Sequence, residues 1–226
     1  MKKLIATDFD GTFFRNGKVD PEDAEGVRLW REAGFKFGFV TGRGTDFFGT
    51  VKELGIDADF IILYNGALIA DAAGNVIYED FIDRETYSAL EKFFEKSPDV
   101  CSFGRAGEAL RYHQYYARYE TPQRALEVAA EVNRIFGEKV NAVVNYHHIN
   151  IGAKGTGKAE GVSRILEYYG FLPDEAAAVG DNFNDIAMLK AHNGWAVDSA
   201  RDEIKRCVSH TCAGVGALAL ELLHRN

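Results

Sequence analysis

The chain has 226 residues and a net charge of −8, from 26 basic and 34 acidic residues. This length is enough for one large domain or two smaller ones, and the acidic balance argues against a nucleic-acid partner, which would need a basic face. No stretch approaches the roughly 18 apolar residues that span a bilayer. The three cysteines form no Cys-x-x-Cys motif, so we expect a reduced, cytoplasmic protein with no membrane partner.

The first eighty residues alternate between strand and helix patterns. In chain order we predict a strand, a helix that Asp20 caps, a strand, a helix and a strand: Lys2–Thr7, Pro21–Gly34, Phe35–Val40, Thr45–Leu54 and Phe60–Leu63. Ala67–Asp71 and Val76–Glu79 then read as a hairpin. This β-α-β-α-β order implies a parallel sheet covered by helices.

The middle of the chain has a different pattern. We predict helices at Arg84–Glu95 and Thr121–Phe136, with strands at Ala109–Tyr116 and Val140–Ile151. The first pattern then resumes, with a helix, a strand and a helix: Lys158–Tyr169, Ala176–Val179 and about Asn184–Lys190. The fold class is therefore α/β: a Rossmann-like parallel-sheet core of residues 1–81 and 153–226, interrupted by an α+β module of residues 82–152.

Two acidic loops follow predicted strands. Asp8 and Asp10 come directly after the first strand, and Gly11 allows a sharp turn behind them. Asp181 and Asp185 follow a later strand. Ligands of open parallel sheets bind beyond the carboxyl ends of the strands, and such hard oxygen ligands suit Mg²⁺. The alternative is that these side chains only form turns and helix caps.

Other residues at predicted strand ends suit phosphate. Thr41 offers a hydroxyl and a backbone N–H, Gly42 allows close approach, and Lys158 begins a helix. Residues 152–158 also match the P-loop spacing G-x-x-x-x-G-K, but Ala159 stands where that motif needs Ser or Thr. Cys207, His210 and Cys212 supply too few ligands for a structural zinc site.

Together these segments resemble the four motifs of the haloacid dehalogenase superfamily. They are Asp8-x-Asp10-Gly11-Thr12, Thr41-Gly42-Arg43, Lys158 and Gly180-Asp181-x-x-Asn184-Asp185, in that order. Asn65-Gly66-Ala67 and the late insertion resemble the Cof-like branch, whose type IIB cap enters between the second and third motifs. Length and spacing are similar to archaeal-type phosphoglycolate phosphatases. The insertion is shorter than many Cof-like caps, and Gly157 precedes the lysine where Ser, Thr or Asp is common.

The resemblance implies a mechanism and a set of roles. Asp8 would be the nucleophile that forms an aspartyl phosphate, and Asp10 would be the general acid and base. Thr41, Gly42, Lys158 and Asn184 would bind the phosphoryl group. Mg²⁺ would be held by Asp8, the main-chain carbonyl of Asp10, Asp181 and Asp185, the last directly or through water.

The function that follows is hydrolysis of small phosphorylated metabolites, such as sugar phosphates or phosphoglycolate, by a monomer or homodimer. A phosphotransferase such as a phosphomannomutase is the alternative, because it would pass the same aspartyl phosphate to a sugar hydroxyl. A sugar-phosphate sensor without turnover is a third reading, although pure binding does not require both a nucleophile and an acid.

Substrate choice is expected to come from the inserted module. Its candidate contacts are Arg111, His113, Arg118, His147 and His148. Side chains alternate along a strand, so at most one of the two adjacent histidines should point into the site.

Overall fold

The computed structural model describes residues 1–107 and 111–225, and its larger part is built on an eight-stranded sheet. From β14 to β5 neighbouring strands pair in parallel, and β6 and β7 add an antiparallel hairpin. Across the sheet, the order is β14 (His210–Cys212), β13 (Trp195–Val197), β12 (Ala176–Gly180), β1 (Leu4–Thr7), β4 (Lys36–Val40), β5 (Phe60–Leu63), β6 (Leu68–Asp71) and β7 (Val76–Glu79). This is the predicted core.

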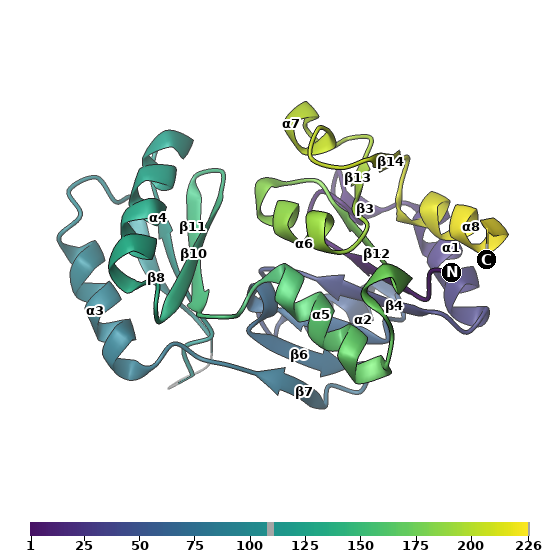
Figure 1. The fold of residues 1–226 in the computed structure, drawn as a ribbon, viewed down its shortest axis with the longest axis horizontal. Coiled ribbons are helices and arrows are strands. Elements are labelled where there is room, and N and C mark those ends of the chain that lie inside the picture. Colours follow the sequence, from purple (N-terminus) through teal and green to yellow (C-terminus); the bar gives the residue numbers. More distant parts are fainter. Residues whose placement is uncertain (108–110, 226) are drawn as a thin grey trace.

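Helices cover this sheet in packed pairs. One pair is α5 (Lys158–Tyr169) with α6 (Ile186–Ala191), and the other is α1 (Pro21–Glu32) with α8 (Val215–Arg225) (Figure 1). The Asp20 carboxylate accepts a hydrogen bond from the Glu22 N–H at 3.0 Å, which confirms the predicted cap of α1. The remaining elements of this part are α2 (Phe47–Leu54), α7 (Asp202–Lys205), η1 (Tyr64–Gly66), η2 (Pro173–Glu175), η3 (Phe183–Asp185), β2 (Phe14–Arg15) and β3 (Lys18–Val19).

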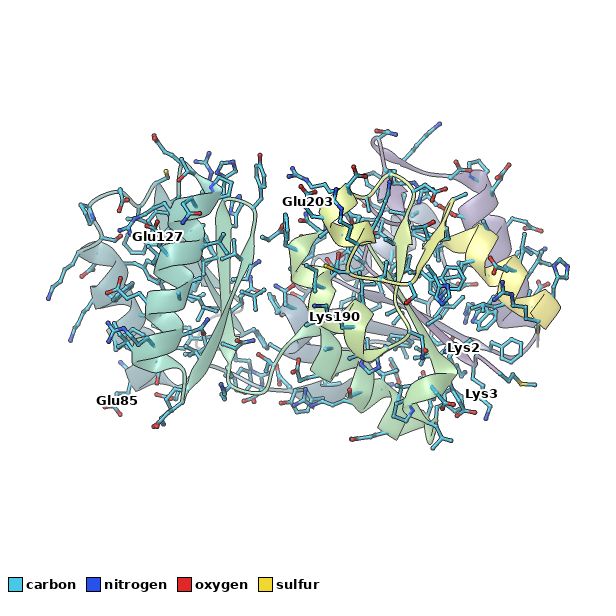
Figure 2. All side chains as sticks on the ribbon, turned by 45° about the horizontal axis from the view of Figure 1, so that its top comes forward. Lys2, Lys3, Glu85, Glu127, Lys190 and Glu203 are labelled. Atoms are coloured by element: carbon cyan, nitrogen blue, oxygen red, sulfur yellow. The ribbon has the colours of Figure 1, made fainter. Side chains whose placement is uncertain are left out.

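The middle of the chain forms a separate four-stranded antiparallel sheet, which we call the cap together with its two helices. Its strands, in order, are β10 (Val140–Asn145), β11 (His148–Ala153), β9 (Gln114–Arg118) and β8 (Ser102–Ala106). Helices α3 (Arg84–Glu95) and α4 (Pro122–Phe136) lie on the side away from the core (Figure 1). Figure 2 shows Glu85 and Glu127 on that outer side, so the opposite face of the cap sheet is turned toward the core.

The cap has an apolar centre of its own. Side chains of α3, α4 and the sheet form a buried cluster distinct from that of the core, including Leu90, Phe94, Tyr115, Val128 and Ile149. Aliphatic and aromatic side chains that leave water together stabilise such a unit. The predicted α/β core with an inserted α+β module is thus confirmed, while the boundaries at residues 81/82 and 152/153 stay a prediction.

One strand of the cap was not predicted, and two predicted strands differ in detail. The strand β8 was not predicted, because a glycine and an arginine interrupt its apolar pattern. The strand predicted at Ala109–Tyr116 occupies Gln114–Arg118, and residues 108–110 lie outside the described residues. The predicted strand Val140–Ile151 is instead a hairpin that turns at Tyr146, where φ is 56°. The turn was missed because no glycine, the residue that usually marks such a turn, stands there.

No helix in the described part of the chain is long and apolar enough to cross a bilayer.

Candidate active site

The two acidic loops meet at one edge of the core sheet. Strands β1 and β12 are parallel neighbours, with Thr7 opposite Val179, so both loops leave the sheet at the same place. The backbone N–H of Asp8 donates to the Val179 carbonyl at 2.9 Å and ties the first loop to the second. The convergence expected from the sequence is therefore present, at the usual ligand position of an open α/β sheet.

Three carboxylates gather there. Asp8, Asp181 and Asp185 each offer an oxygen, and these atoms lie within 4.8 Å of one another. Gly11 has a φ of +93°, and a Cβ at this position would lie 2.5 Å from Asp181 Oδ2. Only glycine allows this approach without strain. Thr12, which the sequence reasoning included only as part of a motif, donates its hydroxyl to Asp181 Oδ1 at 2.6 Å.

Asp185 is held more tightly than the other two carboxylates. It is fully buried, and its Oδ2 accepts the backbone N–H groups of Asp181 at 3.1 Å and Asn182 at 3.0 Å. Gly180 makes room for it, because a Cβ there would lie 2.6 Å from the Cβ of Asp185. The loop therefore folds around this carboxylate.

Lys158 is the one cation that contacts this cluster among the described residues. Its Nζ donates to Asp8 Oδ1 and to Asp185 Oδ1, both at 2.6 Å, and the side chain is buried. Burial opposes the charge, but the carboxylates of Asp185 and Asp8 raise the pKa of Lys158, so it stays protonated. The P-loop alternative is not supported, because this lysine is committed to two carboxylates.

One ammonium does not balance three carboxylates. Burial raises the pKa of Asp8 above its usual value although Lys158 lowers it, and burial likewise raises the pKa of Asp181. A divalent cation would remove this imbalance. Three converging carboxylate oxygens are the hard ligands that Mg²⁺ takes, so the donor set fits the expected metal.

Asp10 is arranged differently from the other acidic residues. Its carboxylate points to Arg43, which binds it with Nε at 2.8 Å and Nη2 at 2.6 Å. The guanidinium also lies over the ring of Phe9, 5.0 Å from its centre. The Asp10 side chain is thus outside the carboxylate cluster, and only its main-chain carbonyl is left for the predicted metal contact. The sequence reasoning assigned no role to Arg43.

Of the residues expected to bind phosphate, Thr41, Gly42 and Asn184 line a cleft of about 280 Å³. Lys158 is outside this lining and contacts Asp8, which lines it. The core wall of the cleft includes Asp8, Asp10, Thr41, Gly42, Arg43, Asn182 and Asn184. The backbone N–H of Thr41 donates to the Ile62 carbonyl at 2.8 Å, so this donor is already used. The Thr41 hydroxyl accepts the Arg43 N–H at 3.1 Å, and its own proton is left for a ligand.

The opposite wall of the cleft comes from the cap. Asn145, His148 and Asn150 line it, and of the expected cap contacts only His148 is among them. Arg111 and His113 instead contact Glu79, at 3.0 Å and 2.8 Å. The expectation that at most one of the adjacent histidines lines the site agrees with this arrangement, because His147 packs against Tyr146 in the turn. Asn150 lies two residues after His148 in β11, so both side chains point to the same face of the sheet. This spacing could have identified Asn150 from the sequence.

Comparison with known proteins assigns the chain to a family. A family model described as haloacid dehalogenase-like hydrolase matches residues 5–114 and 112–215, and the chain belongs to this family. A phosphoglycolate phosphatase of Natronomonas pharaonis is 26% identical, over 87% of this chain and 84% of that protein. A 5-amino-6-(5-phospho-D-ribitylamino)uracil phosphatase of Bacillus subtilis is 25% identical, over 92% and 88%.

Solved structures agree on the fold. A haloacid dehalogenase-like hydrolase of B. subtilis superposes with a TM-score of 0.86 at 20% identity, covering 97% of this chain and 99% of the other. A sugar phosphatase of subclass IIB superposes with a TM-score of 0.78 at 20% identity, covering 99% of each. The predicted Cof-like core with a type IIB cap is therefore confirmed. The chain is a phosphatase of this family, that is, a phosphoric monoester hydrolase.

Proposed function

We propose that this protein is a Mg²⁺-dependent phosphatase that hydrolyses small phosphomonoesters through an aspartyl phosphate on Asp8. The observation that carries the proposal is the position of Asp8 at the end of β1, bound to Lys158 and grouped with Asp181 and Asp185. Asp10 follows two residues later and lines the same cleft. A nucleophile and a proton donor thus border one cavity.

The reaction runs in two steps. In the first, a carboxylate oxygen of Asp8 bonds to phosphorus while the bond from phosphorus to the leaving oxygen breaks, and Asp10 gives that oxygen its proton. In the second, Asp10 takes a proton from water, whose oxygen bonds to phosphorus as the acyl phosphate breaks. Inorganic phosphate leaves, and both carboxyl groups return to their starting state.

The other residues position the phosphoryl group and balance its charge. Lys158, the hydroxyl of Thr41 and the amide of Asn184 would hold its oxygens, and Gly42 would allow the close approach; the lining of the two adjoining pockets by these residues supports this assignment. Mg²⁺, when bound by Asp8, Asp181, Asp185 and the Asp10 carbonyl, supplies charge that offsets the phosphate and carboxylates. Positioning and charge neutralisation dominate catalysis of phosphoryl transfer.

The substrate is a small phosphorylated metabolite. The relatives above are named for phosphoglycolate and for a ribitylaminouracil phosphate, which supports compact phosphomonoesters as the class. The cleft of about 280 Å³ agrees with this size. A cytoplasmic location and a monomeric or homodimeric state stay predictions.

A phosphotransferase remains the alternative, because the first step would be identical. The two functions differ in the acceptor, which is water in one and a sugar hydroxyl in the other. Phosphate release without any added sugar bisphosphate would decide for the phosphatase.

Acid-quenched mass spectrometry tests the proposal. During turnover of p-nitrophenyl phosphate the native protein should carry one phosphate on the peptide that contains Asp8. The Asp8→Asn variant should fold, bind Mg²⁺ more weakly and carry none, since an amide forms no acyl phosphate. Turnover by this variant at a near-native rate, or a phosphate on another residue, would sink the mechanism.

A further inference from the structure

The face of the cap sheet that is turned toward the core is polar and amide-rich. Alternation places Tyr115, Ala117, Ile149 and Ile151 in the buried cluster of the cap. Their neighbours in the same strands must point the other way. Those neighbours are Gln114, Tyr116 and Arg118 in β9, and His148, Asn150 and Gly152 in β11.

Three side-chain amides on this side form a continuous chain between the core and the cap. The Nδ2 of Asn65 donates to Gln114 Oε1 at 2.7 Å, and the Nε2 of Gln114 donates to Asn150 Oδ1 at 3.0 Å. Asn65 follows β5 in a left-handed conformation, with a φ of 52°. Its amide lies against Gly42, where a Cβ would be 3.0 Å from Nδ2. The three hydrogen-bonded amides therefore connect the Thr41–Gly42 loop to Asn150 in the cleft.

The direction of this chain determines what Asn150 presents. Gln114 is 5% exposed and bonded at both ends, with its Oε1 toward Asn65 and its Nε2 toward Asn150. Because Asn150 Oδ1 accepts from Gln114, the two N–H groups on Asn150 Nδ2 are the donors that this amide has left for a ligand. Asn150 lines the cleft, so the cap offers hydrogen-bond donors there.

The cap wall of the cleft has no charge at neutral pH. Within the described residues, its lining side chains are Asn145, His148 and Asn150. Burial first, and then the nearby Arg118 and His147, lower the pKa of His148, which is therefore neutral at pH 7. On the core wall the lining cation is Arg43, and both arms of its guanidinium are bound to Asp10.

We propose that the alcohol part of the substrate is neutral and rich in hydroxyl groups, as in a polyol or sugar phosphate, and that Asn145, His148 and Asn150 read it. This rests on the proposed phosphatase function. Gln114 is the positioning residue: it orients the Asn150 donors and is itself bound by Asn65, whose amide lies against Gly42. A carboxylate in the alcohol part of the substrate would enter beside Asp8 and Asp10 with no uncommitted cation in the described lining, and an unpaired charge in such a site is costly.

Arg118 is the rival to this proposal. It lies opposite His148 in the sheet register and is exposed, outside the cleft lining. A substrate carboxylate that extended past His148 would contact Arg118. The experiment must therefore separate a hydroxyl-reading wall from a carboxylate-reading Arg118.

The first measurement is kcat/KM of the native enzyme with Mg²⁺ for glycerol 3-phosphate, erythritol 4-phosphate, ribitol 5-phosphate, phosphoglycolate and p-nitrophenyl phosphate. We expect kcat/KM to rise along the polyol series and the best polyol phosphate to exceed phosphoglycolate at least tenfold. A preference for phosphoglycolate that disappears in Arg118→Ala overturns the proposal. Absence of turnover with every compound, p-nitrophenyl phosphate included, contradicts the phosphatase function itself instead.

The second measurement tests the amide chain with Gln114→Glu. Glutamate can still accept from Asn65 but cannot donate to Asn150, so we expect the ratio of kcat/KM for the best polyol phosphate to that for p-nitrophenyl phosphate to fall at least tenfold. Asn150→Ala should lower the same ratio and does not depend on Gln114 folding correctly. Ser102→Ala, on the same face at the edge strand β8, is the matched control and should leave the ratio unchanged. An unchanged ratio in both cleft variants overturns the proposal.

Discussion

The two walls of the cleft are built from different chemistry. The core wall holds carboxylates, and both cations near them are already paired: Arg43 in the lining binds Asp10, and Lys158 in the adjoining carboxylate cluster binds Asp8 and Asp185. The cap wall holds two asparagines and a neutral histidine. Under the proposed function, the core residues would act on any phosphoryl group, whereas the cap residues would contact the part that leaves. The proposal therefore assigns reaction and selection to separate units, and we expect that each can be altered independently.

The largest expected effect comes from removing the central charge of the core wall. In Lys158→Met we expect kcat/KM to fall at least about a thousandfold for every substrate, because the lost charge served the transition state. Breaking a buried ion pair also destabilises by about 3–5 kcal/mol, which urea unfolding without metal should detect. Lys190→Met, an exposed lysine on α6 (Figure 2), is the control. A loss confined to one substrate class would contradict the generic role of the core wall.

Metal removal should act on the same wall. We expect chelation to abolish turnover of all substrates and added Mg²⁺ to raise the melting temperature, since the ion binds the folded cluster. Asp181→Asn should raise the Mg²⁺ concentration for half-maximal activity about tenfold or more, while Asp57→Asn, an exposed carboxylate, should not. Ca²⁺ should inhibit, because its longer and more variable ligand distances misplace the nucleophile. Full activity in excess chelator would remove the metal from the mechanism.

The Arg43–Asp10 pair allows a finer test within the core wall. Lysine cannot bind a carboxylate with two parallel hydrogen bonds, so Arg43→Lys should misplace the proton donor. We expect a loss of kcat of about tenfold to a hundredfold with alkyl phosphates. With p-nitrophenyl phosphate the loss should be several times smaller, because its leaving group needs no proton. Equal losses on both kinds of ester would mean that Arg43 does not act through Asp10.

The smallest expected effect comes from protonating His148, which would make the neutral cap wall charged like the core wall. Burial, and then the nearby Arg118 and His147, lower the pKa of His148 below its usual value, so the side chain is neutral at pH 7.5 and gains a proton as the pH falls. The cap wall then becomes cationic. Between pH 7.5 and 5.5 we expect kcat/KM for phosphoglycolate, relative to a polyol phosphate, to rise about twofold to fivefold. This ratio cancels titrations that both substrates share, and His148→Gln should remove its pH dependence.

Core residues were predictable because their signals are local. The buried strand ends at Thr7, directly before Asp8, and Gly11 follows within the turn. The second acidic loop has the same relation to β12. Parallel strands leave a sheet at one edge, so the convergence of the two loops could be expected before the structure was known. The cap was harder to predict. The apolar pattern of β8 is broken, and the turn at Tyr146 has no glycine signature.

The sequence by itself determined the family, the core fold and the candidate reacting groups, since each rests on a short motif whose neighbours along the chain are also its neighbours in space. Only the tertiary structure decided the partners of those groups. Asp10 turns to Arg43, the Thr41 N–H is taken by Ile62, and Arg111 and His113 contact Glu79 away from the cleft. The chain from Asn65 through Gln114 to Asn150 joins residues 49 and 36 positions apart. Such contacts arise from packing two units together, and no local pattern encodes them.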